Sequence, residues 1–525
     1  MNSTSRIMLA MLAFISVISV GAAPAAEPNG EQAALHVLNR LGYGPRPGDI
    51  QKVTQMGVER YIDAQLHPES ITVPAALTQK LAALRTRQKP MGELIAQFRP
   101  GGKGQDREQA QQARRELARE VTEDDAVARL TRAIESPRQL EEVMVDFWFN
   151  HFNDFAGKGL DRVLVGDYEE KAIRPYVLGR FRDLLGASAH HPAMLFYLDN
   201  WQSVAPGTEP LVGPGKGNAA KATGLNENYA RELMELHTLG VDGGYSQKDV
   251  TELARILTGW TFDPREMVRG GAAFRFNTRR HDFGDKVWLG QHVDSRGQAE
   301  GEWALDVLAS HPATARHISK KLAQYFVADE PPPALVERLS RRFTETQGDI
   351  RAVLGTLFQS REFWDAAQVG SKFKTPYQFV VSAARATDVN VINVRPFLGV
   401  LYQLGMPLYG CQTPDGYKNT ESAWLNAEAM TRRINFATAL ASGRLPLAKP
   451  TDADEVQGMG KRQLERAARP DQRANARWET APTDATALEA TLGGQLSAKT
   501  RQTVASAEPA LRAALILGSP DFMYR

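Results

Sequence analysis

The chain has 525 residues, and its 63 Lys and Arg against 61 Asp and Glu give a formal charge of +2. This near balance provides no positive field for nucleic acid or for an anionic membrane surface. Cys411 is the only cysteine, which excludes an internal disulfide and a haem attached through a cysteine pair. Its simplest interpretation is a small buried hydrophobe.

The N-terminus has the pattern of a targeting segment. Arg6 precedes an apolar run over residues 7–20, and Ala23 and Ala25 stand at the spacing that a signal peptidase requires. We therefore expect residues 1–25 to be a signal peptide and the mature protein to be exported, to the periplasm or beyond. An N-terminal membrane anchor is the alternative. No later segment has the roughly 18 apolar residues of a membrane helix, so no transmembrane segment is expected in the mature chain.

Helical spacing of apolar residues along most of the chain predicts a mainly α, multi-helix globular fold. Runs with this spacing cover residues 35–41, 57–66, 140–155, 173–185, 192–198, 303–308, 315–326, 335–343, 350–358 and 378–386. The length exceeds one ordinary hydrophobic core. We expect a helical core over residues 26–447, with two lobes at about 26–262 and 263–447.

Two further segments have a different pattern. Ala273–Phe276 and Lys286–Leu289 alternate apolar and polar residues on either side of a polar turn, His281–Asp285, which predicts that they pair in a small β-hairpin.

Residues 448–508 are polar and poor in aromatics, which is typical of an insertion or a mobile segment. Residues 509–525 are expected to form the last helix of the core.

The stretch from Asn226 to Phe262 combines unusually varied polar side chains. Glu227, Arg231 and Glu235 follow one another at i,i+4, a spacing that forms ion pairs, so a salt-bridged exposed helix is one interpretation. His237 departs from that stripe toward the apolar side. It is either a hydrogen-bonded core residue or a functional group that needs partners from elsewhere.

Other segments supply possible partners. Residues 148–154, WFNHFND, place a histidine, amides and an acid among aromatic residues, and the expected hairpin turn contains another His–Asp pair. A carboxylate beside a histidine fixes the tautomer and raises the basicity of the ring. The candidates for catalysis are His151, Asp154, Asn228, Glu232, His237, His281 and Asp282, and those for metal binding are His151, Glu232 and His237. The sequence contains no His-Glu-x-x-His spacing and no Gly-x-Ser-x-Gly elbow, so no cofactor and no nucleophile are indicated by motif.

Several motifs resemble those of the bacterial family called domain of unknown function 1800 (DUF1800). They are LNRLGYGP at 38–45, DAQL at 63–66, FWFNHF at 147–152, RP at 174–175, HPAML at 191–195, LDN at 198–200, residues 226–260, HD at 281–282, Lys286 and LG at 289–290. The resemblance covers nearly the whole mature chain, and the segment 226–260 is its strongest part.

The resemblance implies an exported helical protein. It also implies a partner, because members often resemble companions of a second exported family with an alkaline-phosphatase-like or sulfatase-like fold. The family has no settled activity, so no residue role is implied. Two functions stay open from the sequence: a binding or assembly protein of the cell envelope, working with such a companion, or a metal-dependent or acid–base periplasmic enzyme that uses the His/Glu/Asp/Asn cluster.

Overall fold

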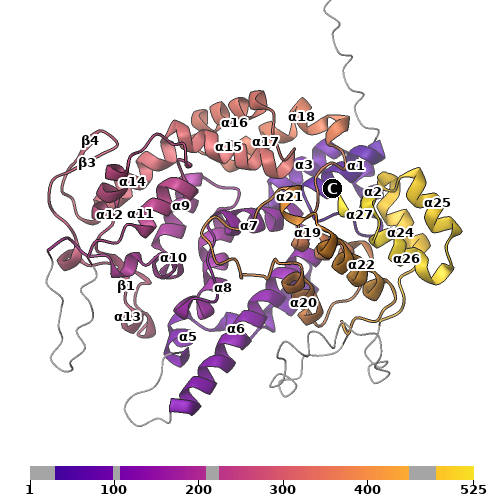
Figure 1. The fold of residues 1–525 in the computed structure, drawn as a ribbon, viewed down its shortest axis with the longest axis horizontal. Coiled ribbons are helices and arrows are strands. Elements are labelled where there is room, and N and C mark those ends of the chain that lie inside the picture. Colours follow the sequence, from indigo (N-terminus) through magenta and orange to yellow (C-terminus); the bar gives the residue numbers. More distant parts are fainter. Residues whose placement is uncertain (1–29, 99–106, 208–223, 449–479) are drawn as a thin grey trace, which may run out of the picture.

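The computed structural model describes residues 30–98, 107–207, 224–448 and 480–525 (Figure 1). The expected signal peptide lies outside these residues. The described chain is mainly α-helical, as predicted, with two small antiparallel sheets of two strands each. None of the described helices is long and apolar enough to cross a lipid bilayer.

In Figure 1 the first half of the chain runs from α1–α3 at the right, through α5–α8 in the centre and lower part, to α9–α12 at the left. Its helices are α1 (Gly30–Arg40), α2 (Asp49–Met56), α3 (Val58–Leu66), α4 (Ala75–Ala82), α5 (Met91–Phe98), α6 (Arg107–Glu135), α7 (Gln139–His151), α8 (Val165–Tyr168), α9 (Phe181–His190), α10 (Pro192–Tyr197), α11 (Asn228–Glu232) and α12 (Gln247–Ile256). Helix α7 is buried on nearly every side and runs through the core. Its last turn therefore carries polar side chains into the interior.

The second half continues with α13 (Pro264–Val268), α14 (Gln298–Ser310), α15 (Pro312–Phe326), α16 (Pro333–Glu345), α17 (Ile350–Phe358), α18 (Arg361–Trp364), α19 (Pro376–Ala386), α20 (Arg395–Gln403), α21 (Glu421–Trp424) and α22 (Ala427–Ala441). Helix α15 packs on α14, α16 and α17. It begins sharply because Pro312 occupies its first turn and the His311 ring accepts a hydrogen bond from the Ala313 amide.

The expected hairpin is wrong in its pairing. The strand β2 (Phe274–Phe276) pairs with β1 (Trp260–Phe262), and β3 (Lys286–Trp288) pairs with β4 (Gln291–Val293). The two segments that alternate in the sequence are both strands, but each finds its partner elsewhere. Between these segments lies His281, which contacts Glu300 in a buried polar network together with Lys286.

The C-terminal part corrects a second expectation. Residues 449–479 lie outside the described residues, but α24 (Ala485–Leu492) and α25 (Ala498–Ser506) are ordered helices that pack on α26 (Pro509–Leu517), ahead of the short α27 (Pro520–Met523). Residues 485–506 are therefore helical and packed on the core rather than mobile, and the polar insertion expected over 448–508 stays a prediction. Leu488, Leu492 and Val504 are buried there. Three widely spaced apolar residues are enough to hold α24 and α25 on the core, because α26 presents an apolar face to them. The predicted last helix is confirmed as α26.

One cluster of buried apolar side chains extends from Ala34 to Met523 and includes residues on both sides of residue 262. The two expected lobes therefore share one core. A small second cluster lies where α5 meets α6, around Leu94 and Leu117. Cys411 is buried, as its interpretation as a hydrophobe requires.

Candidate functional site

Two of the predicted site residues, His151 and His237, meet in the interior. His151 ends α7, and His237 ends a π-helical turn, Leu233–His237, that follows α11. Their ring centroids lie 6.2 Å apart, and the His151 Nε2 atom is 3.1 Å from the His237 carbonyl oxygen. Because a carbonyl only accepts, the proton of a neutral His151 ring is on Nε2, and Nδ1 is left as an acceptor.

Helix α15 adds two basic residues that the sequence reasoning missed. The Lys321 Nζ atom lies 2.8 Å from His151 Nδ1, and the His317 ring centroid lies 6.2 Å from that of His151. His317 and Lys321 are four residues apart, so they lie on one side of α15, at the border of its buried face. That i,i+4 pairing of two basic residues beside Ile318 and Leu322 was the available signal.

Burial lowers the proton affinity of these groups. It lowers the pKa of His237 to about 3 and that of His317 to about 4, and the nearby Lys321 charge lowers both further. Burial, followed by the same lysine charge, also holds the pKa of His151 well below its usual range. Burial and the Lys418 charge lower the pKa of Lys321 to about 8. At pH 7 the three histidines are therefore neutral, while Lys321 is mostly protonated with a minor neutral fraction.

The backbone around the cluster requires glycine at one position. Gly240 has a φ of 83°, and a Cβ atom on it would lie 2.9 Å from His317 Nδ1. Its amide donates to the Met234 carbonyl at 3.2 Å and closes the turn after His237. Glycine thus lets the 233–240 segment approach α15 closely.

A loop from residue 406 to residue 418 covers the end of α7. Asn150 and Tyr417 exchange two hydrogen bonds, from Asn150 Nδ2 at 2.8 Å and from the Tyr417 amide at 2.7 Å. The same loop carries Lys418 and Asp415, which form an ion pair at 2.7 Å and act electrostatically on Lys321. Lys321 itself stays partly exposed.

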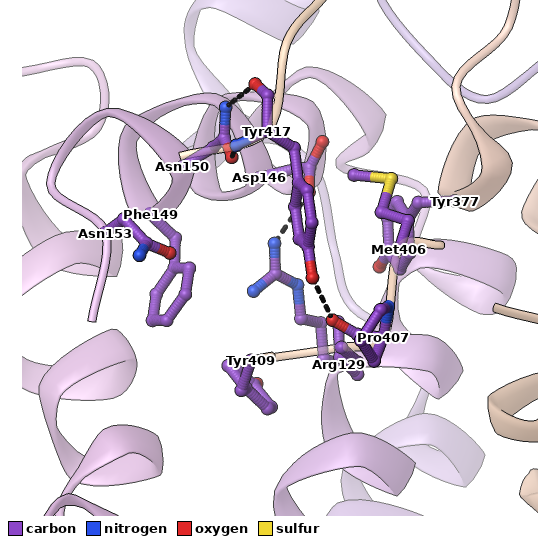
Figure 2. A pocket seen from close by; sticks show the side chains of 11 residues that line it. Arg129, Asp146, Phe149, Asn150, Asn153, Tyr377, Met406, Pro407, Tyr409 and Tyr417 are labelled. Carbon is purple, nitrogen blue, oxygen red and sulfur yellow. Dashed lines mark hydrogen bonds and ion pairs between the residues drawn. The ribbon is translucent and has the colours of Figure 1, made fainter. Parts of the chain in front are cut away.

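The cavity beside this loop is not the functional site. Its volume of about 20 Å³ holds one or two waters but no substrate. It is lined by Arg129, Asp146, Phe149, Asn150, Asn153, Tyr377, Met406, Pro407, Leu408, Tyr409 and Tyr417 (Figure 2). Arg129 is held by Asp146 at 2.6 Å and by Glu169 at 2.9 Å, and its guanidinium lies over the Phe149 ring. This is a charge-compensated structural centre.

Asp154 turns away from the histidines and pairs with a residue that the sequence reasoning missed, Asp161. Both side chains are buried, and each acts electrostatically on the other. Burial raises the pKa of Asp154 to about 7, and burial together with the Asp154 charge raises that of Asp161 still more. One proton shared between the two carboxyl groups accounts for the pair.

The other predicted residues belong to separate structures. Asn228 Nδ2 donates to the Leu198 carbonyl at 3.3 Å and ties α11 to the end of α10. His281 and Asp282 lie between α12 and α14, where His281 contacts Glu300 and Asp282 contacts Arg255. Glu232 is partly exposed, and its pKa is raised by burial and by the Glu235 charge.

The three predicted metal ligands are not assembled. Within the described ranges, no group of three or more His, Cys, Asp or Glu side chains is arranged to hold a metal ion. The His151 nitrogens face a carbonyl and an amine, and His317 Nε2 lies 3.3 Å from the Leu236 carbonyl. These ring nitrogens therefore already have hydrogen-bond partners in the positions where a shared metal ion would have to bind.

A comparison with protein-family models matches residues 36–524 to the family described as "Protein of unknown function (DUF1800)". The chain belongs to the DUF1800 family. The resemblance expected from the motifs is thus confirmed over nearly the whole length. The search of curated proteins and the search of solved structures each give no match.

Membership in DUF1800 brings no activity with it, so the chemistry of this chain rests on its own side chains. The segment of strongest resemblance, 226–260, contributes the His237 carbonyl that orients His151, while FWFNHF contributes His151 itself. The amine comes from α15, outside both segments.

Proposed function

We propose that this DUF1800 chain is an exported enzyme that works by acid–base chemistry at His151 and Lys321. The observation that carries the proposal is the 2.8 Å contact between Lys321 Nζ and His151 Nδ1, with the far side of the ring hydrogen-bonded to the His237 carbonyl. The Lys321 amine is the reactive group, the His151 ring is its base, and the His237 carbonyl orients that ring. Three groups hydrogen-bonded in this order activate a side chain for proton transfer.

The electrostatics support this role. A general base works best when its pKa lies near the ambient pH, and the pKa of about 8 for Lys321 is close to that range. Lys321 is partly exposed, whereas His151 behind it is 2% exposed. Export is proposed from the leader pattern in residues 1–25.

The role of an envelope assembly protein with a phosphatase-like or sulfatase-like companion stays a prediction from the family resemblance. No feature of the described residues identifies a surface for that companion. The acid–base role is preferred because it has a specific contact behind it.

The test is turnover of an undefined substrate pool. Purified protein is incubated with a pool of small water-soluble metabolites, and mass spectrometry follows every component with time. We expect at least one component to change with the unaltered protein and with Lys320→Arg, an exposed neighbour, but not with Lys321→Met or His151→Gln. Circular dichroism confirms that each variant is folded. No change in any component, or equal change with all four proteins, would refute the proposal.

A further inference from the structure

Lys321 differs from the buried lysines Lys286 and Lys372 in having no carboxylate partner. Lys286 contacts Glu300 at 2.8 Å, and Lys372 forms an ion pair with Asp329. Within the described part of the chain, no acid lies at salt-bridge distance from Lys321, and its hydrogen bond is to the His151 ring. A carboxylate would hold the proton on the amine, so its absence leaves the nitrogen lone pair available.

Lys374 also lacks an acid, but it cannot serve a ligand from solution. It is 2% exposed, and its Nζ atom lies 3.8 Å from the centroid of the Phe522 ring. Lys321 is partly exposed and points at a base. Among these lysines, only Lys321 combines access, a free lone pair and a proton acceptor.

We propose that Lys321 is an amine nucleophile that forms a Schiff base with a small aldehyde or ketone. This inference rests on the proposed acid–base role of the same pair and names its substrate class. Two features known to activate lysines support it: removal from water and a neighbouring cation, here Lys418.

The steps need one proton from solvent and no other reagent. The neutral Lys321 nitrogen attacks the carbonyl carbon, a C–N bond forms, and the carbonyl π electrons move to oxygen. His151 Nδ1 accepts a proton from the nitrogen and returns it to the oxygen, which gives a neutral carbinolamine. A second proton, taken from solvent, lets the hydroxyl group leave as water while the nitrogen lone pair forms the C=N bond. The His237 carbonyl holds the Nε2–H of His151 throughout, so that Nδ1 faces the amine as an acceptor. The cationic iminium that results withdraws electrons from the adjacent carbon.

The experiment is reductive trapping. The purified protein is incubated at pH 7 with acetaldehyde or pyruvate and sodium cyanoborohydride at limiting concentrations. Peptide mapping then locates the alkylated lysines. We expect the label on Lys321 at least about tenfold faster than on exposed lysines such as Lys52, Lys171 and Lys418. This follows from the larger neutral fraction of an amine with a lower pKa.

Matched variants separate site chemistry from exposure. Lys320→Arg should leave the trapping rate unchanged, whereas Lys321→Arg, which keeps the charge, should remove the fast phase. Trapping spread over the exposed lysines, with no fast phase lost in Lys321→Arg, would overturn the inference. If turnover of the metabolite pool requires Lys321 but no trapping occurs, the Schiff-base inference is wrong and the proposed acid–base function is retained. If Lys321 is trapped rapidly but no metabolite is turned over, Lys321 is a nucleophile and the proposed enzymatic function is wrong.

Discussion

Two regions of the molecule pair a lysine with a histidine, and only one of them contains a carboxylate. Between α12 and α14, Glu300 Oε1 lies 3.0 Å from His281 Nε2, and Glu300 Oε2 lies 2.8 Å from Lys286 Nζ. At the end of α7, Lys321 contacts His151 directly. The residue types are alike, but the first region is compensated in charge and the second is not.

The compensated region is built for stability. Burial would raise the pKa of Glu300, but the hydrogen bonds from His281 and Lys286 hold it below its usual value. The Arg296 and Gly297 amides also donate to Glu300, at 3.0 and 3.1 Å. A buried charge with this many donors is fixed in place, while an amine with a single neutral partner can change its protonation state. The comparison teaches that the carboxylate, more than the lysine or the histidine, decides which region can react.

The largest expected effect is the difference between two identical substitutions. Lys286→Met should lower the free energy of unfolding by about 3–5 kcal/mol, because it removes one partner of a buried ion pair and leaves Glu300 with one cation fewer. Lys321→Met should change the free energy of unfolding by less than about 1 kcal/mol, because this substitution removes a buried amine that forms no ion pair with an acid. Urea denaturation measures both. Equal losses in the two variants would contradict the comparison.

The second effect is the pH dependence of the amine. With a pKa of about 8, against about 10.4 for a model lysine, Lys321 should have roughly 200-fold more neutral amine at pH 7. Acylation of Lys321, followed by mass spectrometry, should therefore rise with pH and level off above about pH 8–9. A midpoint near pH 10 would show that Lys321 is an ordinary surface lysine.

The third effect is the pH dependence of stability that comes from the two buried acids Asp154 and Asp161. Asp154 and Asp161 have raised pKa values in the folded protein, so the fold binds their proton more tightly than the unfolded chain does. Their contribution is complete below about pH 4 and is lost as the pH rises toward about 7. The slope approaches roughly 1.4 kcal/mol per pH unit for one proton. Denaturation between pH 4 and pH 8 should show this slope.

Asp161→Asn provides the control for that slope, because the amide keeps a donor toward Asp154 without a proton to lose. We expect a flatter dependence of stability on pH over the same range. A slope that is unchanged in Asp161→Asn would assign it to another buried acid, such as Asp125, whose pKa burial also raises to about 7.

The sequence predicted the fold class and half of the site. Long apolar helices such as α7 are visible in one dimension because their buried faces recur every three or four residues. His151 and His237 were found because each stands in a run of unusual composition. Lys321 was missed because it lies in an ordinary amphipathic helix, and its importance depends on α7, 170 residues away in the chain.

The hairpin failed for a related reason. Alternation of apolar and polar residues identifies a strand but not its partner, so β2 and β3 were paired with each other although each pairs with a neighbour of its own. Asp161 gave no signal at all, since a lone acid in a Gly-rich loop is usually solvated. Its burial depends on α8, α10 and the loop around it, none of which a local pattern contains.

The smallest expected effect lies at the cap of α12, beside the compensated region. Ser246 and Asp249 form a capping box, and Asp249 Oδ1 also accepts from the Leu289 amide at 2.9 Å, next to β3. Ser246→Ala should therefore cost about 1 kcal/mol, the usual value of a helix cap. Because the cap contacts the sheet of Lys286 and no residue of the α7–α15 pair, the trapping rate at Lys321 should stay unchanged. A loss of trapping in Ser246→Ala would mean that the two regions are coupled through α12, and that the reactive pair depends on the compensated one.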